Sequence, residues 1–140
     1  MLVRELMTTD VVTVGIDATL REAVGRLLDE GVGSVVVVED DTPAGFVTET
    51  DALRAAHDRG EPLQAIAVRD LAHPPVVTTD PDRTVRSVAT TMADEGVKKV
   101  LVTEDLDIVG IVTLTDVVWH LSDIRKEAAA IQRRDWGPGD

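Results

Sequence analysis

The chain has 140 residues, of which 44% are hydrophobic and 29% charged, and its 26 acidic and 14 basic side chains give a net charge of −12 at pH 7. This length supports a single domain with an apolar core, and the hydrophobic share argues against disorder. No apolar run is long enough to span a membrane, no basic stripe offsets repulsion by a nucleic-acid backbone, and the lack of cysteine excludes disulfides and thiolate chemistry. We therefore expect a soluble, cytoplasmic protein that binds neither membranes nor nucleic acids.

A β-branched run and a capping pattern predict the first strand and the first long helix. Val11–Val14 favours a strand. Thr19 and Glu22 have the spacing of a capping box, in which a hydroxyl and a carboxylate accept hydrogen bonds from free N–H groups at a helix start. Gly31 then supplies a left-handed helix stop. The apolar face of this helix consists of Leu20, Ala23, Val24, Leu27 and Leu28.

Two further strands and a second helix follow. The unbroken valine run Val35–Val38 is typical of a strand that is buried on both faces. Residues 40–43 predict a turn, Gly45–Thr48 a third strand, and a helix is expected to begin near Thr50. Gly60-Glu-Pro62 then interrupts the pattern. The first 62 residues therefore predict the order βαββα.

The same order of elements recurs further along the chain. Shifting the sequence by 65 positions places residues 3–55 over residues 68–120 without a gap, and Gly45-Phe-Val-Thr-Glu-Thr-Asp51 then lies over Gly110-Ile-Val-Thr-Leu-Thr-Asp116. A period of this length that occurs twice indicates a duplicated supersecondary unit, because a solenoid needs shorter and more numerous repeats. We expect a mixed α/β fold with one motif at residues 1–62 and another at residues 63–124. Residues 125–140 would complete a closing helix, from Thr115 to about Arg134, and a loose tail.

A threonine and an aspartate recur at one helix start in each copy. Thr48 and Asp51 are three residues apart across a strand–helix junction, and so are Thr113 and Asp116. This spacing places a hydroxyl and a carboxylate beside the free N–H groups of the first turn, where phosphate is attracted and a carboxylate can chelate the two hydroxyls of a ribose. Helix capping alone would explain one such pair. Its recurrence in the same register in both copies favours binding.

These segments resemble the signature ending of the CBS domain, a family named after cystathionine β-synthase. The similarity runs from Val3 to about Ile124 and includes the opening Val-Arg-Glu-Leu-Met and the turn Asp-Glu-Gly-Val. The resemblance implies a Bateman module, in which two CBS motifs with small mixed sheets covered by helices are related by a pseudo-twofold axis. It also implies two clefts for adenosine-containing ligands, each combining the Thr/Asp pair of one motif with adenine-contacting strands of the other.

The resemblance implies a set of ligand-binding residues for each cleft. Lys98 and Lys99 fall where phosphate-binding basic residues occur in similar proteins, whereas the first copy has Gly33 and Ser34 there. The expected ligand is AMP, ADP or ATP, or a relative such as S-adenosylmethionine or NAD, with no cofactor and no metal. One cleft would comprise Thr48 and Asp51 with Val76, Val77, Thr78, Val97, Lys98 and Lys99. The other would comprise Thr113 and Asp116 with Val11, Val12, Thr13, Val32, Gly33 and Ser34.

No combination of residues in the sequence points to catalysis. His57, His73 and His120 share no metal-ligand spacing and are expected at the surface, and neither a glycine-rich phosphate loop nor a nucleophile elbow is present. We therefore expect a non-enzymatic regulatory module that senses an adenosine-containing ligand and acts on an unidentified partner protein. Two alternatives stay open. One is a structural dimerisation module with vestigial clefts, and the other is an enzyme whose active site the sequence does not reveal.

The helix faces and the charge composition predict the assembly and the setting of the protein. Four helices around a thin core leave apolar surface uncovered, which favours a homodimer. Asp outnumbers Glu, and the lysines are Lys98, Lys99 and Lys126. This bias suits solubility in high salt, so a salt-loving source is favoured over an ordinary acidic cytosolic protein. The apolar positions are Leu20, Val24, Leu27 and Leu28 in the first copy and Val117, Val118, Leu121 and Ile124 in the second.

Overall fold

The computed structural model describes residues 1–73 and 76–121, which fold into two compact units. The first unit runs from Asp10 to Val76 and is here called the contiguous unit. The second combines Met1–Thr9 with described residues 77–121 and is here called the composite unit. The division therefore differs from the two sequence copies, since the opening residues of each copy belong to the unit formed by the other copy.

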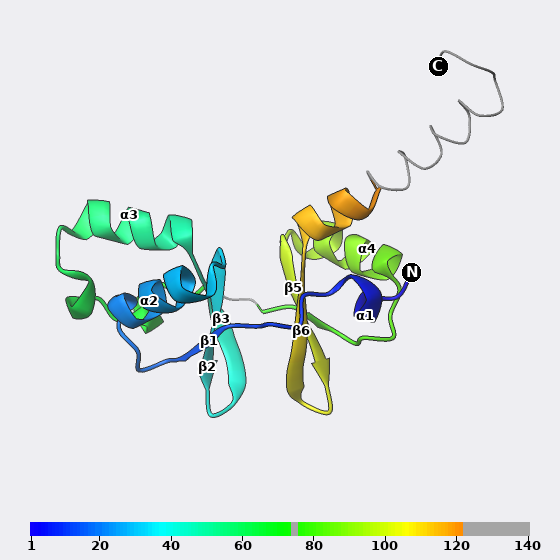
Figure 1. The fold of residues 1–140 in the computed structure, drawn as a ribbon, viewed down its shortest axis with the longest axis horizontal. Helices are drawn as coiled ribbons and strands as arrows, with labels where there is room; N and C mark the ends of the chain where they lie inside the picture. The colour runs from blue at the N-terminus through cyan, green and yellow to red at the C-terminus, as the bar shows by residue number, and fades with distance from the viewer. Residues whose placement is uncertain (74–75, 122–140) are drawn as a thin grey trace, which may run out of the picture. The chain divides into compact units, whose positions relative to one another are not determined.

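The contiguous unit is a three-stranded sheet with two α-helices packed on one face (Figure 1). The strand order is β1-β2-β3, with β1 parallel and β3 antiparallel to β2. Its strands are β1 (Thr13–Gly15), β2 (Ser34–Glu39) and β3 (Thr42–Thr48). Its helices are α2 (Leu20–Glu30) and α3 (Glu49–Arg59), followed by the 3₁₀ turns η1 (Leu63–Ala65) and η2 (Val68–Asp70).

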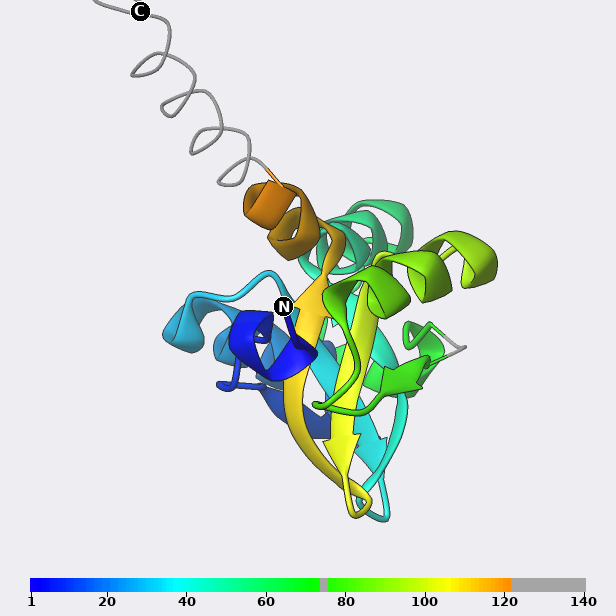
Figure 2. The ribbon, with the colours of Figure 1, turned by 90° about the vertical axis from the view of Figure 1, so that its right-hand side faces the viewer.

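The composite unit repeats this architecture, and Figure 2 shows it from its own side. Its sheet has the order β4-β5-β6, again with one parallel and one antiparallel pair. The elements are α1 (Val3–Leu6), β4 (Thr78–Thr79), α4 (Val85–Glu95), β5 (Lys99–Glu104) and β6 (Asp107–Thr113), followed by helical residues 114–121. Both sheets are mixed and carry helices, so the expected fold class is confirmed.

Each unit has an aliphatic core between its sheet and its helices. In the contiguous unit, Val35, Val37 and Val47 of the sheet are fully buried together with Leu20 of α2 and Ile66. In the composite unit, the buried cluster consists of Val3, Val85, Val88, Met92, Val100, Val102, Val112 and Val117. Valines thus fill the cores in place of aromatic residues, which are scarce in this chain, and their branched side chains pack well on a pleated sheet.

The opening segment of each copy packs on the sheet of the other copy. The backbone N–H of Val3 donates to the carbonyl of Arg83, and Thr8 forms an antiparallel bridge with Ile111. The equivalent contacts in the contiguous unit join Val68 to Ala18, and His73 to Phe46. Two ion pairs follow the same rule, Arg4 with Asp82 and Arg69 with Asp17. The two copies therefore exchange equivalent segments.

Local details differ from the sequence expectations in three places. The first strand is Thr13–Gly15 rather than Val11–Val14, because pairing with β2 begins at the Thr13–Val36 register. The predicted turn at residues 40–43 is shortened to Asp40 and Asp41, both with positive φ, and β3 already begins at Thr42. Helix α3 begins at Glu49, one residue before the expected start. The expected helix end near Arg134, Ile124 and the tail lie outside the described residues.

Candidate functional site

Thr48 and Asp51 form a capping box at the start of α3. The backbone N–H of Asp51 donates to the Thr48 hydroxyl over 3.1 Å, and the backbone N–H of Thr48 donates to Asp51 Oδ2 over 2.8 Å. The Asp51 side chain is only 10% exposed. Its position is thus set by the main chain at the point where β3 turns into α3.

Thr113 and Asp116 form the same box in the composite unit. The Asp116 N–H donates to the Thr113 hydroxyl over 3.2 Å, and the Thr113 N–H donates to Asp116 Oδ2 over 2.9 Å. Capping uses Oδ2 of each carboxylate and leaves Oδ1 outside the capping box. Capping and ligand binding are therefore compatible at both positions.

Strand pairing places the basic and small residues of each copy beside its own Thr/Asp pair. Ser34 is the register partner of Thr48, and the carbonyl of Gly33 accepts a hydrogen bond from the α3 backbone. Lys99 is the register partner of Thr113, and the carbonyl of Lys98 accepts from the N–H of residue 114 over 2.8 Å. Within the composite unit, then, both predicted phosphate-binding lysines lie next to Thr113.

The predicted adenine-contacting segments lie at the start of β1 and of β4, which are edge strands of the two sheets. The carbonyl of Val12 accepts from Val36 N–H, and Thr13 begins β1. The carbonyl of Val77 accepts from Leu101 N–H, and Thr78 begins β4. Val11 and Val76, which precede these contacts, are half-buried. The grouping of these residues into ligand sites stays a prediction.

The carboxylate of Asp51 has a further partner that sequence reasoning missed. His73 Nε2 lies 2.7 Å from Asp51 Oδ1. Burial would raise the pKa of Asp51, but the hydrogen bonds from the Thr48 backbone, from His73 and from the Thr48 hydroxyl outweigh it, so this pKa is lowered. His73 was expected only as a surface residue. The signal that could have found it is its position in the repeat, where the first copy has Thr8.

The remaining histidines form no such contact with the capping boxes. His57 is exposed and pairs with its neighbour Asp58 at 2.9 Å, and His120 is half-buried in the last described helical turns. Among residues 1–73 and 76–121, no three His, Asp or Glu side chains are placed to hold a metal ion. In the same part of the chain, no helix has the length and apolarity that crossing a membrane requires.

Comparison with known proteins identifies the repeat. The family model of the CBS domain matches residues 3–58 and 68–123. Protein MK0525 of Methanopyrus kandleri is 31% identical over 118 residues, which cover 83% of this chain and 60% of that protein. The CBS domain-containing protein YhcV of Bacillus subtilis is 27% identical, over 82% of this chain and 81% of its own length. The chain spans only 33% and 41% of two longer relatives from Methanocaldococcus jannaschii.

Solved structures share the fold. The CBS-domain protein ATU1752 of Agrobacterium tumefaciens superimposes with a TM-score of 0.72 at 30% identity, over 86% of this chain and 98% of that one. The CBS domain pair of protein MJ0100, solved with 5′-methylthioadenosine and S-adenosyl-L-methionine, gives a TM-score of 0.75 at 22% identity, over 88% and 97% of the two chains. The second likeness concerns the fold alone.

Proposed function

The chain belongs to the CBS-domain family, and on that premise we propose that it is a non-enzymatic regulatory module that binds an adenosine-containing ligand. The observation that carries the proposal is the pair of equivalent capping boxes at Asp51 and Asp116. Each holds a carboxylate rigidly at a helix start, with one oxygen beyond the capping bond. A rigid carboxylate of this kind can accept both hydroxyls of a ribose without having to reorganise first.

The rest of the ligand would be held by backbone and by cations. Adenine would bind to the edges of the strand segments at Val11–Thr13 and Val76–Thr78, whose main-chain groups need no special side chain. The lysines at 98 and 99 would bind phosphate by charge-assisted hydrogen bonds. AMP, ADP and ATP are therefore the first ligands to test, followed by S-adenosylmethionine and NAD. The adenosine compounds bound by MJ0100, a structural neighbour, support the choice of this ligand class.

A thermal-shift and calorimetric screen tests the proposal directly. A ligand that binds only the native state stabilises it by RT ln(1 + [L]/Kd), so a ligand at a hundred times its Kd adds about 2.7 kcal/mol. We expect a rise in melting temperature with at least one of these adenosine compounds, and none with the matching guanosine compound. Equal effects of adenosine and guanosine compounds would contradict the proposal.

A structural dimerisation module is the second candidate function. It is favoured by an apolar hollow of about 320 Å³ between α2 and α3, flanked by Leu28 and Leu53, which are 76% and 73% exposed. Exposed leucines beside a groove are typical of association surfaces. We expect a homodimer by light scattering at micromolar concentration in high salt, and dissociation in Leu28→Glu/Leu53→Glu. A monomeric wild-type protein would exclude this function but would leave ligand binding untouched.

A further inference from the structure

In the structure, a histidine covers the carboxylate of Asp51. His73 Nε2 lies 2.7 Å from Oδ1, while the Thr48 N–H donates to Oδ2 over 2.8 Å. The Asp51 side chain is 10% exposed and that of His73 is 64% exposed. Both carboxylate oxygens are therefore engaged, and the imidazole is the group that lies on the solvent side.

The main chain fixes His73 in this position. Its N–H donates to the carbonyl of Phe46 over 3.2 Å, which forms an isolated antiparallel bridge to β3. The segment approaches β3 so closely that a Cβ on Gly45 would lie 3.0 Å from both the Ala72 Cβ and the His73 backbone nitrogen. Glycine at position 45 is thus what lets residues 72 and 73 sit against the strand.

The second copy provides an internal comparison without the histidine. Thr8 occupies the position equivalent to His73 and forms the same bridge, with Ile111. The backbone around Asp116 is likewise equivalent, including both hydrogen bonds of its capping box. The backbone N–H of Thr113 donates to Asp116 Oδ2 over 2.9 Å, as that of Thr48 does to Asp51 Oδ2. Equivalent backbone thus carries a histidine in the unit that contains Asp51 and a threonine in the unit that contains Asp116.

The charged groups around His73 come from α3 and η2. Arg59 is paired with Asp70 across the hollow beside them, at 3.6 Å, and Asp58 is paired with His57. The side chain in direct contact with the Asp51 carboxylate is the imidazole of His73. The hollow measures about 240 Å³, and the charged and titratable side chains that line it are those of Asp51, Arg54, Asp58, Arg59, Asp70 and His73.

We propose that His73 is a gate on the carboxylate of Asp51, occupying it in the ligand-free protein and leaving it when the hydroxyls of a ribose bind. This inference rests on the proposed function and adds a specificity-determining residue to one of its two sites. Histidine changes its charge between about pH 5 and 8, and the charged form binds a carboxylate more strongly. The gate is therefore tighter in acid, so ligand affinity at Asp51 increases with pH while affinity at Asp116 does not.

The test uses adenosine as the probe, because it carries a ribose but no phosphate. In an Asp116→Ala background, which leaves Asp51 as the reporting site, titration calorimetry compares wild-type His73 with His73→Thr at about pH 6 and about pH 8. Threonine is the residue that the second copy carries here, so the backbone accommodates it. We expect His73→Thr to bind adenosine about three- to tenfold more tightly at the lower pH, with a small difference at the higher pH. His57→Thr, an exposed histidine on the same unit, serves as the control and changes neither value.

The possible results separate the gate from the proposed function. Adenosine binding that appears only in His73→Thr would support the gate. Equal affinity of both proteins at both pH values would overturn the gate and leave ligand binding intact. Weaker binding by His73→Thr would also overturn the gate, since the histidine would then help to hold the ligand. Failure of every variant to bind adenosine, AMP, ADP or ATP would overturn the proposed function and the gate with it. Imidazole NMR shifts of ligand-free protein add an independent measurement: those of His73 should change on Asp51→Asn.

Discussion

At the scale of single residues, Asp51 and Asp116 cap helices, and the proposed function gives both a second role in ligand binding, so substituting them tests the two roles together. We expect Asp51→Ala and Asp116→Ala each to lower the free energy of unfolding by about 1 kcal/mol, the usual effect of losing a helix-start cap. Each should abolish one adenosine-ligand site, because two hydroxyl bonds to a charged acceptor contribute a hundredfold or more to affinity. Calorimetric stoichiometry and chemical denaturation measure both effects. Asp29→Ala, at an exposed position of α2, is the control and should keep both sites.

The lysines at 98 and 99 should give one site its preference for phosphate. A charge-assisted hydrogen bond contributes roughly 1.5–3 kcal/mol, so Lys98→Ala/Lys99→Ala should reduce ADP affinity about ten- to a hundredfold and leave adenosine affinity unchanged. Combining the double mutant with Asp51→Ala or Asp116→Ala identifies which of the two carboxylates binds the same ligand molecule as the lysines. The family resemblance predicts Asp51. Unchanged ADP binding in every combination would mean that neither lysine contacts phosphate.

A reciprocal substitution can transfer that preference. The position equivalent to Lys98 in the first copy is Gly33, where an added Cβ would meet only Glu49 Oε1, at an ordinary contact distance of 3.8 Å. We therefore expect Gly33→Lys to fold and to raise ADP affinity at the other site, while Arg21→Ala, which removes an exposed cation from α2, leaves both sites as they are.

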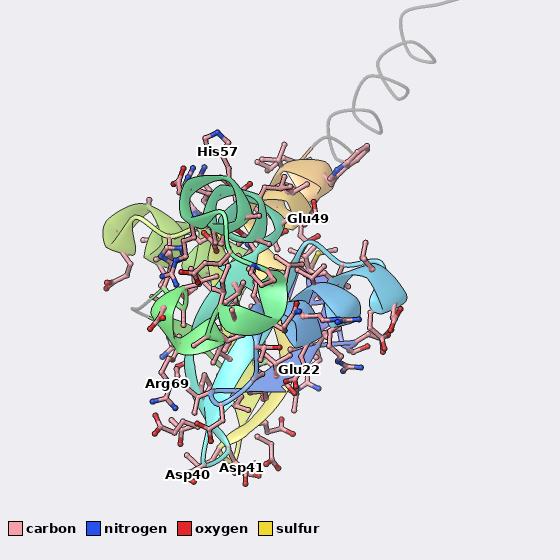
Figure 3. The ribbon with its side chains drawn as sticks, turned by 90° about the vertical axis from the view of Figure 1, so that its left-hand side faces the viewer. Glu22, Asp40, Asp41, Glu49, His57 and Arg69 are labelled. Atoms are coloured by element: carbon pink, nitrogen blue, oxygen red, sulfur yellow. The ribbon has the colours of Figure 1, made fainter. Side chains whose placement is uncertain are left out.

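At the scale of elements, the two hairpins differ in a way that affects stability. Each has a two-residue turn with positive φ, Asp40-Asp41 in one and Asp105-Leu106 in the other. Figure 3 shows the first pair at the tip of its hairpin, at the opposite end of the unit from Glu49 and His57. Leu106 has φ +72° and is 92% exposed, so it bears the strain of the left-handed region without burying apolar surface. Leu106→Gly should raise the free energy of unfolding by about 0.5–1 kcal/mol, measured as a higher melting temperature. Asp41→Gly should raise the free energy of unfolding less, because aspartate tolerates this conformation. A fall in melting temperature with Leu106→Gly would contradict the prediction.

The sequence predicted best those elements whose signals are local. Helix α2 begins after Thr19 and ends at Gly31 as expected, because a capping box and a left-handed glycine act within one helical turn. The strand limits were less accurate, since β1 is defined by its pairing with β2 rather than by its own valines. The contact between His73 and Asp51 was missed, because it joins residues 22 positions apart through a bridge to β3 that no local pattern encodes, and only the comparison of the two copies points to position 73.

At the scale of the whole molecule, the exchange of opening segments makes each copy depend on residues of the other. Val3 is fully buried in the composite unit, in a cluster with Val88, Val100 and Val112. Val68 is fully buried in the contiguous unit, at the equivalent place in the repeat. A substitution at either position should therefore destabilise the sheet of the other copy, which is distant from it in sequence.

Substituting these two valines tests the exchange in both directions. Val3→Ala removes two buried methyl groups and should lower the free energy of unfolding by about 1–3 kcal/mol. Amide hydrogen exchange should then accelerate in α4, β5 and β6, although Val3 precedes β1 in sequence, whereas Val68→Ala should accelerate exchange in α2, β2 and β3. Leu2→Ala, at a partly exposed neighbouring position, is the control and should cost much less. If each copy instead packed its own opening segment, the two exchange patterns would be reversed, with Val3→Ala loosening β1–β3 and Val68→Ala loosening β4–β6.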